Sequence, residues 1–531
     1  MVIFVRSEPT SVATRPFLQR SASLRTTQRV FNALPSLQDG RGLPPQPELL
    51  ASLPALNTDS WKVFPDGRMQ TIYTLRPNLT WQDGVSLTAD DFVFAWRVYA
   101  SPELGFAGQP PMSVISDVAT SDREHFVIHW KGPYPDADAL SQDGRELPAL
   151  PQHILGSAFE QVATSGRDSV ANHPFWSQQY VGLGPYRIQR WEVGSFIDAV
   201  RFERYVLGAP KIARIQLRFS SDQNVVMASL LAGEAHAATE SSIPNYPEAL
   251  MQQWDRTRAG RVFSWPSSYR AMMLQLRPEL ANPRAILAPR IRKAIAYAVD
   301  KQAVSDAVYA GQAVFADTPV WKGSAWGGAI DDSIPVYPMD PRASENLMNE
   351  VGFNKGSDRF YRATDGQLTL EIATTESPDA IRELPVMADR LQAAGYHVEQ
   401  RVIAAALSQD GQLRSTFPAV QITGTFMGEV GLEGLSSTQI PTPSNRWIGL
   451  NRGGWASPDF DGLLDTFKVT LAHGDRLAVM RQMLRAYGES LPWISLFFPA
   501  QAFAQVTELK GPAPVVPEAS VAWNIYEWEF R

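Results

Sequence analysis

Residues 61–96 read WKVFPDGRMQTIYTLRPNLTWQDGVSLTADDFVFAW, and this stretch combines the signals of strands, tight turns and a helix. An Asp-Gly pair, which is typical of hairpin turns, occurs at residues 66–67 and again at 83–84. Residues 88–91 form a capping box, and the apolar residues after it are spaced as on one face of a helix. The stretch therefore predicts a hairpin followed by a helix, with its aromatic residues in a core.

Strand and helix signals also alternate along the rest of the chain. Residues 212–219 are typical of a strand, after which Asp222 is expected to cap a helix that ends at Gly233. Further helices are expected from Asp340 to Gly352, over residues 379–394, and over residues 475–487. This alternation predicts a mixed α/β protein.

Composition limits the class of protein. At about 150 residues per domain, 531 residues suggest three or four folding units. The net charge of -7 disfavours sequence-independent binding of nucleic acid, which needs a basic surface. The chain has no cysteine, which excludes disulfides, thiolate nucleophiles and zinc fingers, and no apolar run approaches the roughly 18 residues of a membrane span.

The order and spacing of the motifs in residues 61–96 resemble those of the family 5 solute-binding proteins of ABC importers, which include oligopeptide and dipeptide receptors. The resemblance extends along the chain in VGLGPYRIQRWEVG (181–194, with Leu183 where Thr is usual), RIRKAIAYAVDKQAVSDAVYAGQA (290–313), DPRASENLMNEVGF (340–353), SPDFDGLL (457–464) and LPWISLFF (491–498). It therefore covers nearly the whole chain.

The resemblance implies a fold. We expect an α/β protein like the type II periplasmic binding proteins, with two lobes, a hinge, a ligand cleft between the lobes, and three domains. Lobe I would be discontinuous and contain residues 1–45, 184–267 and 490–531. Residues 46–183 would form a second domain packed on lobe I, and residues 268–489 would form lobe II.

The resemblance also implies a function. We expect an extracytoplasmic receptor, in the periplasm or at the cell surface, that binds a peptide-like or other polar solute and delivers it to a membrane permease and its ATPase. Such a receptor is expected to be a monomer without cofactor, metal or enzymatic activity. The start, VIFVRSEPTS, resembles the first strand of a mature receptor, so we expect that the signal peptide is missing from this sequence and leave open a lipid anchor.

Two other functions remain open on the sequence: a hydrolase acting on a similar ligand, and a sensor or chaperone with the same fold. Sequence patterns of serine hydrolases, zinc peptidases and P-loops do not occur. His125 and His129 should share one face of a strand, but two histidines make a weak metal site.

One stretch suggests a ligand contact. Peptide-binding members of the family carry G-W-x-x-D where this chain has residues 425–429, and their Asp receives the α-ammonium group of the ligand. Phe426 takes the position of the Trp and Glu429 that of the Asp, while Glu433 is a competing carboxylate. We expect Glu429 to be hydrated in the empty protein, so that Glu429→Gln would hardly change stability.

Other candidates follow from the places that family members use for ligand contact, although ordinary packing or surface exposure is an equal alternative for each. Arg270 is the candidate partner of a ligand carboxylate. The full set of candidate ligand-binding residues is Phe31, Asn32, Tyr269, Arg270, Trp321, Trp326, Phe426, Met427, Glu429, Trp447 and Asn451.

Overall fold

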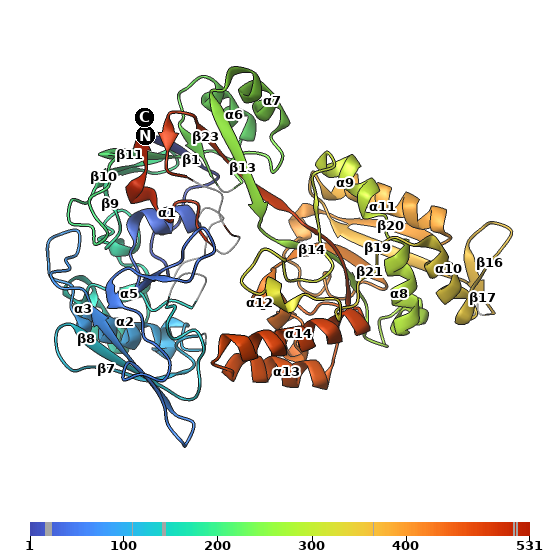
Figure 1. Cartoon of the computed structure of the whole chain (residues 1–531), viewed down its shortest axis with the longest axis horizontal. Coiled ribbons are helices and arrows are strands. Elements are labelled where there is room, and N and C mark those ends of the chain that lie inside the picture. The colour runs from blue at the N-terminus through green and yellow to red at the C-terminus, as the bar shows by residue number, and fades with distance from the viewer. Residues whose placement is uncertain are drawn as a thin grey trace. The chain divides into compact units, whose positions relative to one another are not determined.

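The computed structural model describes residues 1–15, 24–108, 110–140, 145–239, 241–364, 366–512, 516 and 519–531. These residues form two compact units (Figure 1). The first contains Met1–Trp265 and Gln501–Arg531, and the second contains Pro266–Ala500. The second unit is therefore inserted, in sequence, into the first.

The first unit contains a sheet to which both the start and the end of the chain contribute. Among the described residues its strands follow the order β13 (Gly260–Pro266), β23 (Ala500–Val506), β12 (Ala237–Ala238), β1 (Val2–Val5), β11 (Arg214–Phe219), β10 (Phe196–Arg201) and β9 (Tyr186–Glu192). β1 is an interior strand and pairs in parallel with β11 on one side and β12 on the other.

The side chains of β1 are buried on both faces of this sheet. Ile3 joins a hydrophobic cluster with α1 (Leu24–Phe31) and the C-terminal tryptophans Trp523 and Trp528. Phe4 joins a second cluster with α6 (Gln223–Leu231) and α7 (Glu248–Thr257). The apolar run at the start of the sequence is therefore a central core strand.

The stretch 61–96 forms the elements that its sequence predicts. β5 (Trp61–Val63) and β6 (Met69–Leu75) make a hairpin, and α2 (Ala89–Tyr99) begins with a capping box between Thr88 and Asp91. β6 belongs to a second sheet of the first unit with β4 (Leu50–Ser52), β8 (His125–Trp130) and β7 (Ile115–Thr120). The first unit also contains β2 (Ser36–Leu37), β3 (Gln46–Pro47), β24 (Leu509–Lys510), β25 (Glu529–Phe530), α3 (Gln152–Glu160), α4 (Val162–Ser165) and α5 (Asp168–Ala171).

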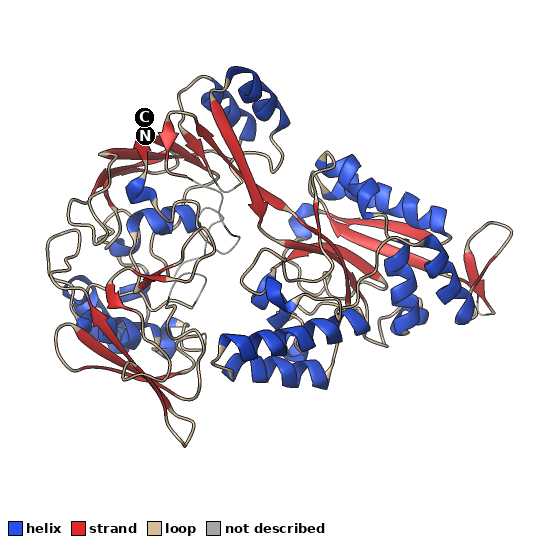
Figure 2. Ribbon diagram, viewed as in Figure 1, coloured by secondary structure: helices blue, strands red, loops and turns tan. Residues whose placement is uncertain are grey.

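The second unit is built around one mixed sheet with helices on both sides (Figure 2). Its strand order in the described residues is β15 (Val314–Phe315), β22 (Trp493–Phe498), β14 (Tyr269–Leu274), β21 (Val420–Thr425), β19 (Thr369–Thr375) and β20 (His397–Ile403). A smaller sheet contains β16 (Asn354–Lys355), β17 (Tyr361–Ala363) and β18 (Gly366–Gln367). The helices are α8 (Pro289–Ala298), α9 (Lys301–Tyr309), α10 (Pro341–Glu350), α11 (Ala380–Ala394), α12 (Gly428–Glu433), α13 (Pro458–Val469) and α14 (His473–Ser490).

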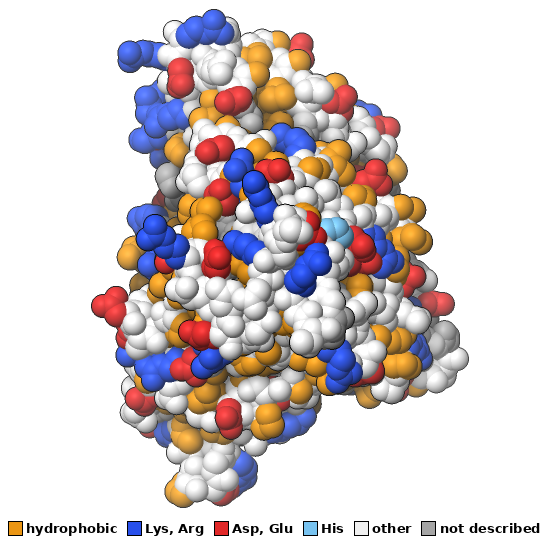
Figure 3. Space-filling view, turned by 90° about the vertical axis from the view of Figure 1, so that its right-hand side faces the viewer, with side chains coloured by type: hydrophobic (Ala, Val, Ile, Leu, Met, Phe, Trp, Pro, Cys, Tyr) orange, Lys and Arg blue, Asp and Glu red, His pale blue; other side chains and the backbone are white. Residues whose placement is uncertain are grey.

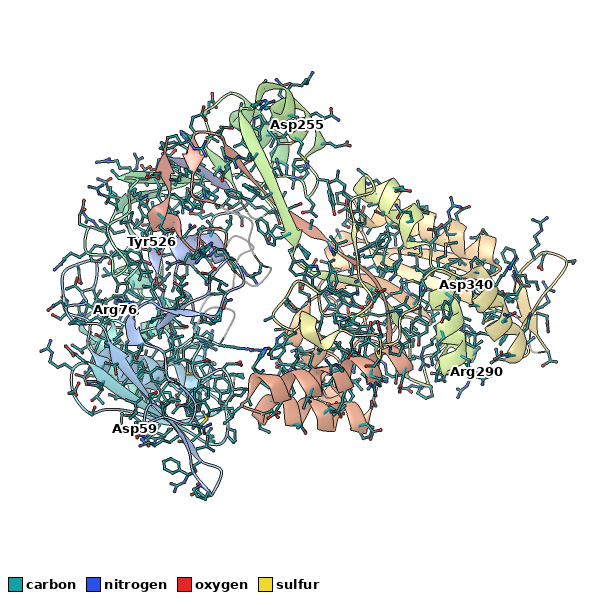
Figure 4. The ribbon with its side chains drawn as sticks, viewed as in Figure 1. Asp59, Arg76, Asp255, Arg290, Asp340 and Tyr526 are labelled. Atoms are coloured by element: carbon teal, nitrogen blue, oxygen red, sulfur yellow. The ribbon has the colours of Figure 1, made fainter. Side chains whose placement is uncertain are left out.

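The predicted helix starts are confirmed. Asp222 accepts hydrogen bonds from the backbone N–H groups of Asn224 and Val225 at the start of α6. Asp340 caps α10 in the same way, through the N–H groups of Arg342 and Ala343 (Figure 4). Each cap satisfies donors that the first helical turn leaves without partners.

One of the two boundaries between the units differs from the predicted boundary between the lobes. The chain leaves the first unit after Trp265, close to the expected residue 267, but returns after Ala500 instead of 489. The assignment of residues 490–500 to lobe I is wrong, because β22 pairs with β14 and β15 in the sheet of the second unit. Residues 46–183 lie within the first unit, and their separation as a domain stays a prediction.

Charged groups of both signs are spread over the surface. On the face in Figure 3, basic and acidic side chains are interspersed with apolar ones and form no continuous basic stripe among the described residues. Within the described part of the chain, no helix has both the length and the apolar character needed to cross a bilayer.

Candidate functional site

The candidate site lies where β21 reaches the surface of the second unit. The strand is buried at Val420 and becomes more exposed toward its end, and the next residue, Phe426, has 57% of its surface exposed. The backbone then turns through Gly428, whose φ of 66° favours glycine and whose N–H donates to the carbonyl of Pro319 over 2.9 Å. This turn presents Phe426 to solvent and starts α12 directly behind it.

Glu429, in the first turn of α12, forms an ion pair with Arg476 of α14. Arg476 Nη2 lies 3.4 Å from Glu429 Oε2, and the side chains are 8% and 13% exposed. The expectation of a hydrated Glu429 is therefore wrong, because α14 covers it and supplies a cation. Glu433, the competing carboxylate, lies at the last residue of the same short helix and is half-buried.

Aromatic rings surround this arginine. The guanidinium carbon of Arg476 lies 4.9 Å from the ring centroid of Trp326 and 4.3 Å from that of Phe467. The ring of His473, one turn earlier on α14, stacks on Trp326 with centroids 4.9 Å apart. Cation–π contacts of this kind stabilise a partly desolvated arginine and fix its orientation toward Glu429.

The structure thus brings four of the predicted residues together: Trp321, Trp326, Met427 and Glu429. Trp326 belongs to the main hydrophobic cluster of the second unit, and Trp321 and Met427 are partly buried against that cluster. Gly323 makes room for the ring of Trp321, because a Cβ atom at residue 323 would lie 2.3 Å from it. Trp321, Trp326 and Met427 thus form an apolar wall near the charge pair of Glu429 and Arg476, and the exposed Phe426 directly precedes Met427 in the chain.

Tyr269 and Arg270 lie on opposite faces of the same sheet. Tyr269 is fully buried, and its hydroxyl lies 2.7 Å from that of Tyr487 and 2.5 Å from that of Ser495. Arg270 Nε donates to Glu383 Oε2 on α11 over 2.6 Å. Burial alone would lower the pKa of Arg270, but the Glu383 carboxylate outweighs it and raises that pKa. Arg270 is therefore already matched by a carboxylate of its own unit.

The two predicted asparagines are interior residues. Asn451 is fully buried and donates to the carbonyls of Leu435, Ser436 and Trp455. Asn32, in the first unit, donates to the carbonyls of Val12 and Gln28 and accepts a hydrogen bond from Tyr180. Their side-chain amides hold loops in place within their units.

The two remaining candidates are aromatic. Phe31 is fully buried in the cluster around β1. Trp447 is half-buried in a left-handed backbone conformation, with φ at 61°, and its N–H donates to Thr442. Phe31 and Tyr269 thus contribute to cores, whereas Phe426 has the exposure that an aromatic contact to a solute requires.

Sequence reasoning missed Arg476, although a signal was present. The buried face of α14 contains Met480, Met483, Leu484 and Tyr487, and Arg476 continues that face one turn earlier. A charged residue in line with an apolar stripe must find a buried partner, and Glu429 is that partner. Among the described residues no group of three or more metal-ligating side chains comes together.

Comparison with known proteins decides the family. The model of the bacterial extracellular solute-binding proteins, family 5 Middle, matches residues 53–428, which is more than half of the chain. The chain belongs to family 5 of these proteins. The residues matched include both the hairpin-and-helix stretch at 61–96 and the turn at Phe426 and Gly428.

Curated relatives of this family 5 protein are distant. Protein XP55 of Streptomyces lividans is 26% identical over 413 residues, covering 76% of this chain and 66% of XP55. The oligopeptide-binding protein AppA of Bacillus subtilis is 20% identical over 453 residues, covering 84% of this chain and 78% of AppA.

Solved structures confirm the fold. The substrate-binding protein CtaP of Listeria monocytogenes gives a TM-score of 0.77 at 18% identity, with 100% of this chain and 99% of CtaP covered. NikZ of Campylobacter jejuni in complex with Ni(L-His) gives 0.73 at 22% identity, with 99% of each chain covered. An oligopeptide-binding protein of Thermus thermophilus with a pentapeptide gives 0.73 at 18%, with 100% and 96% covered. The predicted α/β fold of the periplasmic binding proteins is therefore correct.

Proposed function

We propose that this family 5 protein is the extracytoplasmic receptor of an ABC importer, which binds a small polar solute and delivers it to a membrane permease and its ATPase. The family match over residues 53–428 carries this proposal. The relative AppA is named an oligopeptide-binding protein. A monomer without catalytic activity is part of the proposal.

The proposed solute is peptide-like. The Thermus thermophilus relative holds a pentapeptide, whereas NikZ holds Ni(L-His), so the fold accepts ligands of different kinds. In this chain, Glu429 supplies a carboxylate three residues after Phe426, whose side chain is exposed. A carboxylate next to an apolar wall suits a primary ammonium on an amphipathic ligand, since charge-assisted hydrogen bonds contribute about 1.5–3 kcal/mol each.

Arg476 already provides one cation for the carboxylate of Glu429. Because Glu429 Oε2 faces Arg476, a ligand ammonium would approach the carboxylate as its second cation. The N–O separation of 3.4 Å is longer than the roughly 2.7–2.9 Å of a strong charge-assisted bond, and a carboxylate can accept several hydrogen bonds, so Glu429 can contact a ligand ammonium while it faces Arg476.

A thermal-shift screen tests the proposal. Peptides of two to five residues, sugars and metal chelates are added separately to the full chain, and a bound solute raises the melting temperature by mass action. The ligand found is then incubated at length with the protein and recovered. We expect intact ligand at one molecule per chain; cleaved product in excess of the protein would instead show a hydrolase.

A second experiment addresses delivery. The permease and ATPase of the proposed importer, reconstituted in vesicles, should hydrolyse ATP faster when the ligand-loaded protein is added. A ligand that binds tightly without any such response would favour a sensor or chaperone.

A further inference from the structure

Three arginines come together at one end of the sheet of the second unit. Leu274, the last residue of β14, pairs with Val420, the first residue of β21, so residues 275–277 and 414–419 extend from the same edge. Arg277 Nη2 donates to the carbonyls of both Ser415 and Arg452. The backbones that carry Arg414 and Arg452 are thereby held against one guanidinium group.

Two glycines allow this close approach. A Cβ atom at Gly453 would lie 2.2 Å from the carbonyl oxygen of Leu274, and one at Gly454 would lie 2.4 Å from Cγ of Arg277. Gly454 also has a φ of 73°, in the left-handed region. Gly453 and Gly454 therefore let the segment that follows Arg452 pack closely against the end of β14 and against Arg277.

The donors of Arg277 are used within the protein. Its Nε donates to Gln275 Oε1 over 3.1 Å and its Nη1 to the carbonyl of Pro441 over 3.2 Å, in addition to the two bonds from Nη2. Arg277 therefore has the role of a positioning residue, which fixes the loops around it.

Arg414 and Arg452 have donors left over. Arg414 Nη1 donates to the carbonyl of Ser408 over 3.0 Å, but its Nε is buried without a hydrogen-bond partner in the described part of the chain. Arg452 is half-buried, and no described residue forms an ion pair or a side-chain hydrogen bond with it. An unmatched, partly desolvated cation is costly, and two adjacent ones repel each other.

The charge balance of the group agrees with this geometry. Burial, together with the smaller effect of the neighbouring Arg414, lowers the pKa of Arg452 to about 10. Burial also lowers the pKa of Arg414 and of Arg277, and the attraction of Glu279 does not compensate for it at Arg277. Acidic side chains of the described residues therefore do not neutralise the group.

We propose that Arg414 and Arg452, held in place by Arg277, bind an oxyanion, which is a carboxylate or a phosphate group. Planar guanidinium groups with free N–H donors match the oxygen pairs of both anions and bind them through paired hydrogen bonds. The site lies within the second unit and does not depend on the proposed importer function.

The test uses the full chain in buffers of equal ionic strength that contain chloride, inorganic phosphate or succinate. Isothermal titration and thermal shift should show saturable binding of phosphate, succinate or both, and the comparison of the two anions distinguishes a phosphate site from a carboxylate site. Arg452→Gln and Arg414→Gln should each weaken that binding about tenfold or more. Arg342→Gln, at an exposed arginine of α10, is the matched control and should leave it unchanged.

A second readout separates binding from folding. Because Arg452 has no partner in the described residues, Arg452→Gln should not lower the melting temperature in chloride buffer, yet should abolish the stabilisation by the anion. Absence of saturable binding of either anion to the original protein would overturn the proposal. Unchanged affinity in both glutamine variants would overturn it as well.

Discussion

Arg29 and Glu48 form an ion pair in the interior of the first unit, with Arg29 Nη1 2.6 Å from Glu48 Oε1 and side chains 2% and 1% exposed. The hydroxyl of Tyr205 donates to Glu48 Oε1 and accepts from Arg29 Nη2. Burial alone would lower the pKa of Arg29, but Glu48 and Tyr205 outweigh it and raise that pKa above its ordinary value. Arg29 Nε also donates to the carbonyl of Trp523, so this network joins α1 to the C-terminal segment.

The network should be essential for stability. Glu48→Gln would leave the buried guanidinium of Arg29 without a counter-charge, and we expect the free energy of unfolding to fall by about 3–5 kcal/mol. Denaturant unfolding followed by tryptophan fluorescence measures this change. As a control, Asp66→Asn breaks the exposed pair with Arg68 and should leave the unfolding midpoint unchanged. A Glu48→Gln protein as stable as the original would contradict the prediction.

Gly184 should tolerate no side chain. A Cβ atom at this residue would lie 2.2 Å from the carbonyl carbon of Phe31 and 2.3 Å from the nitrogen of Asn32. Gly184→Ala must displace that backbone and should cost about 1–3 kcal/mol of stability. Gly156→Ala in α3 is the control: its Cβ would meet a flexible side chain at 3.6 Å, so stability should hold or rise. Equal melting temperatures for Gly184→Ala and the original protein would refute the close approach.

Glu429→Gln tests the proposed ammonium contact. We expect the binding free energy of a peptide with a free amino terminus to become less favourable by about 2–4 kcal/mol, so that its affinity falls roughly 30- to 1,000-fold. Stability should also fall, by about 1–3 kcal/mol, because Arg476 loses the carboxylate that it faces. Calorimetric titration and thermal unfolding give the two quantities separately.

Two controls show whether Glu429 itself makes the contact and whether the ligand ammonium is its partner. Glu433→Gln should bind peptides normally; if it loses affinity instead, Glu433 is the contact. N-acetylation of the peptide should weaken binding to the original protein and add little further loss in Glu429→Gln, as expected when both changes remove one shared contact. Equal binding of acetylated and free peptides to the original protein would mean that the ligand has no ammonium contact here.

His236 should make stability depend on pH. Its Nδ1 accepts the N–H of Val2 over 3.0 Å, which requires the neutral ring, and burial together with the nearby N-terminal amine lowers the pKa of His236 below 6.5. The unfolded chain then binds a proton more readily than the folded protein, so stability is full above about pH 6.5 and decreases as the pH falls through that value. In His236→Asn, whose amide can accept the same hydrogen bond, the decrease below pH 6.5 should be smaller. Parallel pH profiles for the two proteins would contradict this role.

Local features of this fold were predictable from sequence, because their partners are close along the chain. The caps at Thr88, Asp222 and Asp340 bond to residues two or three positions away, and the hairpin turns depend on an adjacent glycine. The family resemblance added the overall fold, which local patterns alone do not specify.

Long-range contacts explain the errors. Asn32 and Asn451 were candidates for ligand contact, but their amides also donate to the carbonyls of Val12 and Leu435, which lie 20 and 16 residues away along the chain. Every residue of β22 is buried and all but Ser495 are apolar, which suits the interior of either sheet, so its pairing with β14 had to come from the structure. Glu429 was predicted to be hydrated because Arg476 lies 47 residues away along the chain.

The position of β23 between β12 and β13 sets the order in which the protein can mature during synthesis. The second unit is one continuous segment and has all its strands once Ala500 has left the ribosome. The sheet of the first unit has to wait for residues 500–506, although its other strands were made hundreds of residues earlier. Until then β12 and β13 have unpaired edges, so the first unit cannot complete its sheet before the last part of the chain is available.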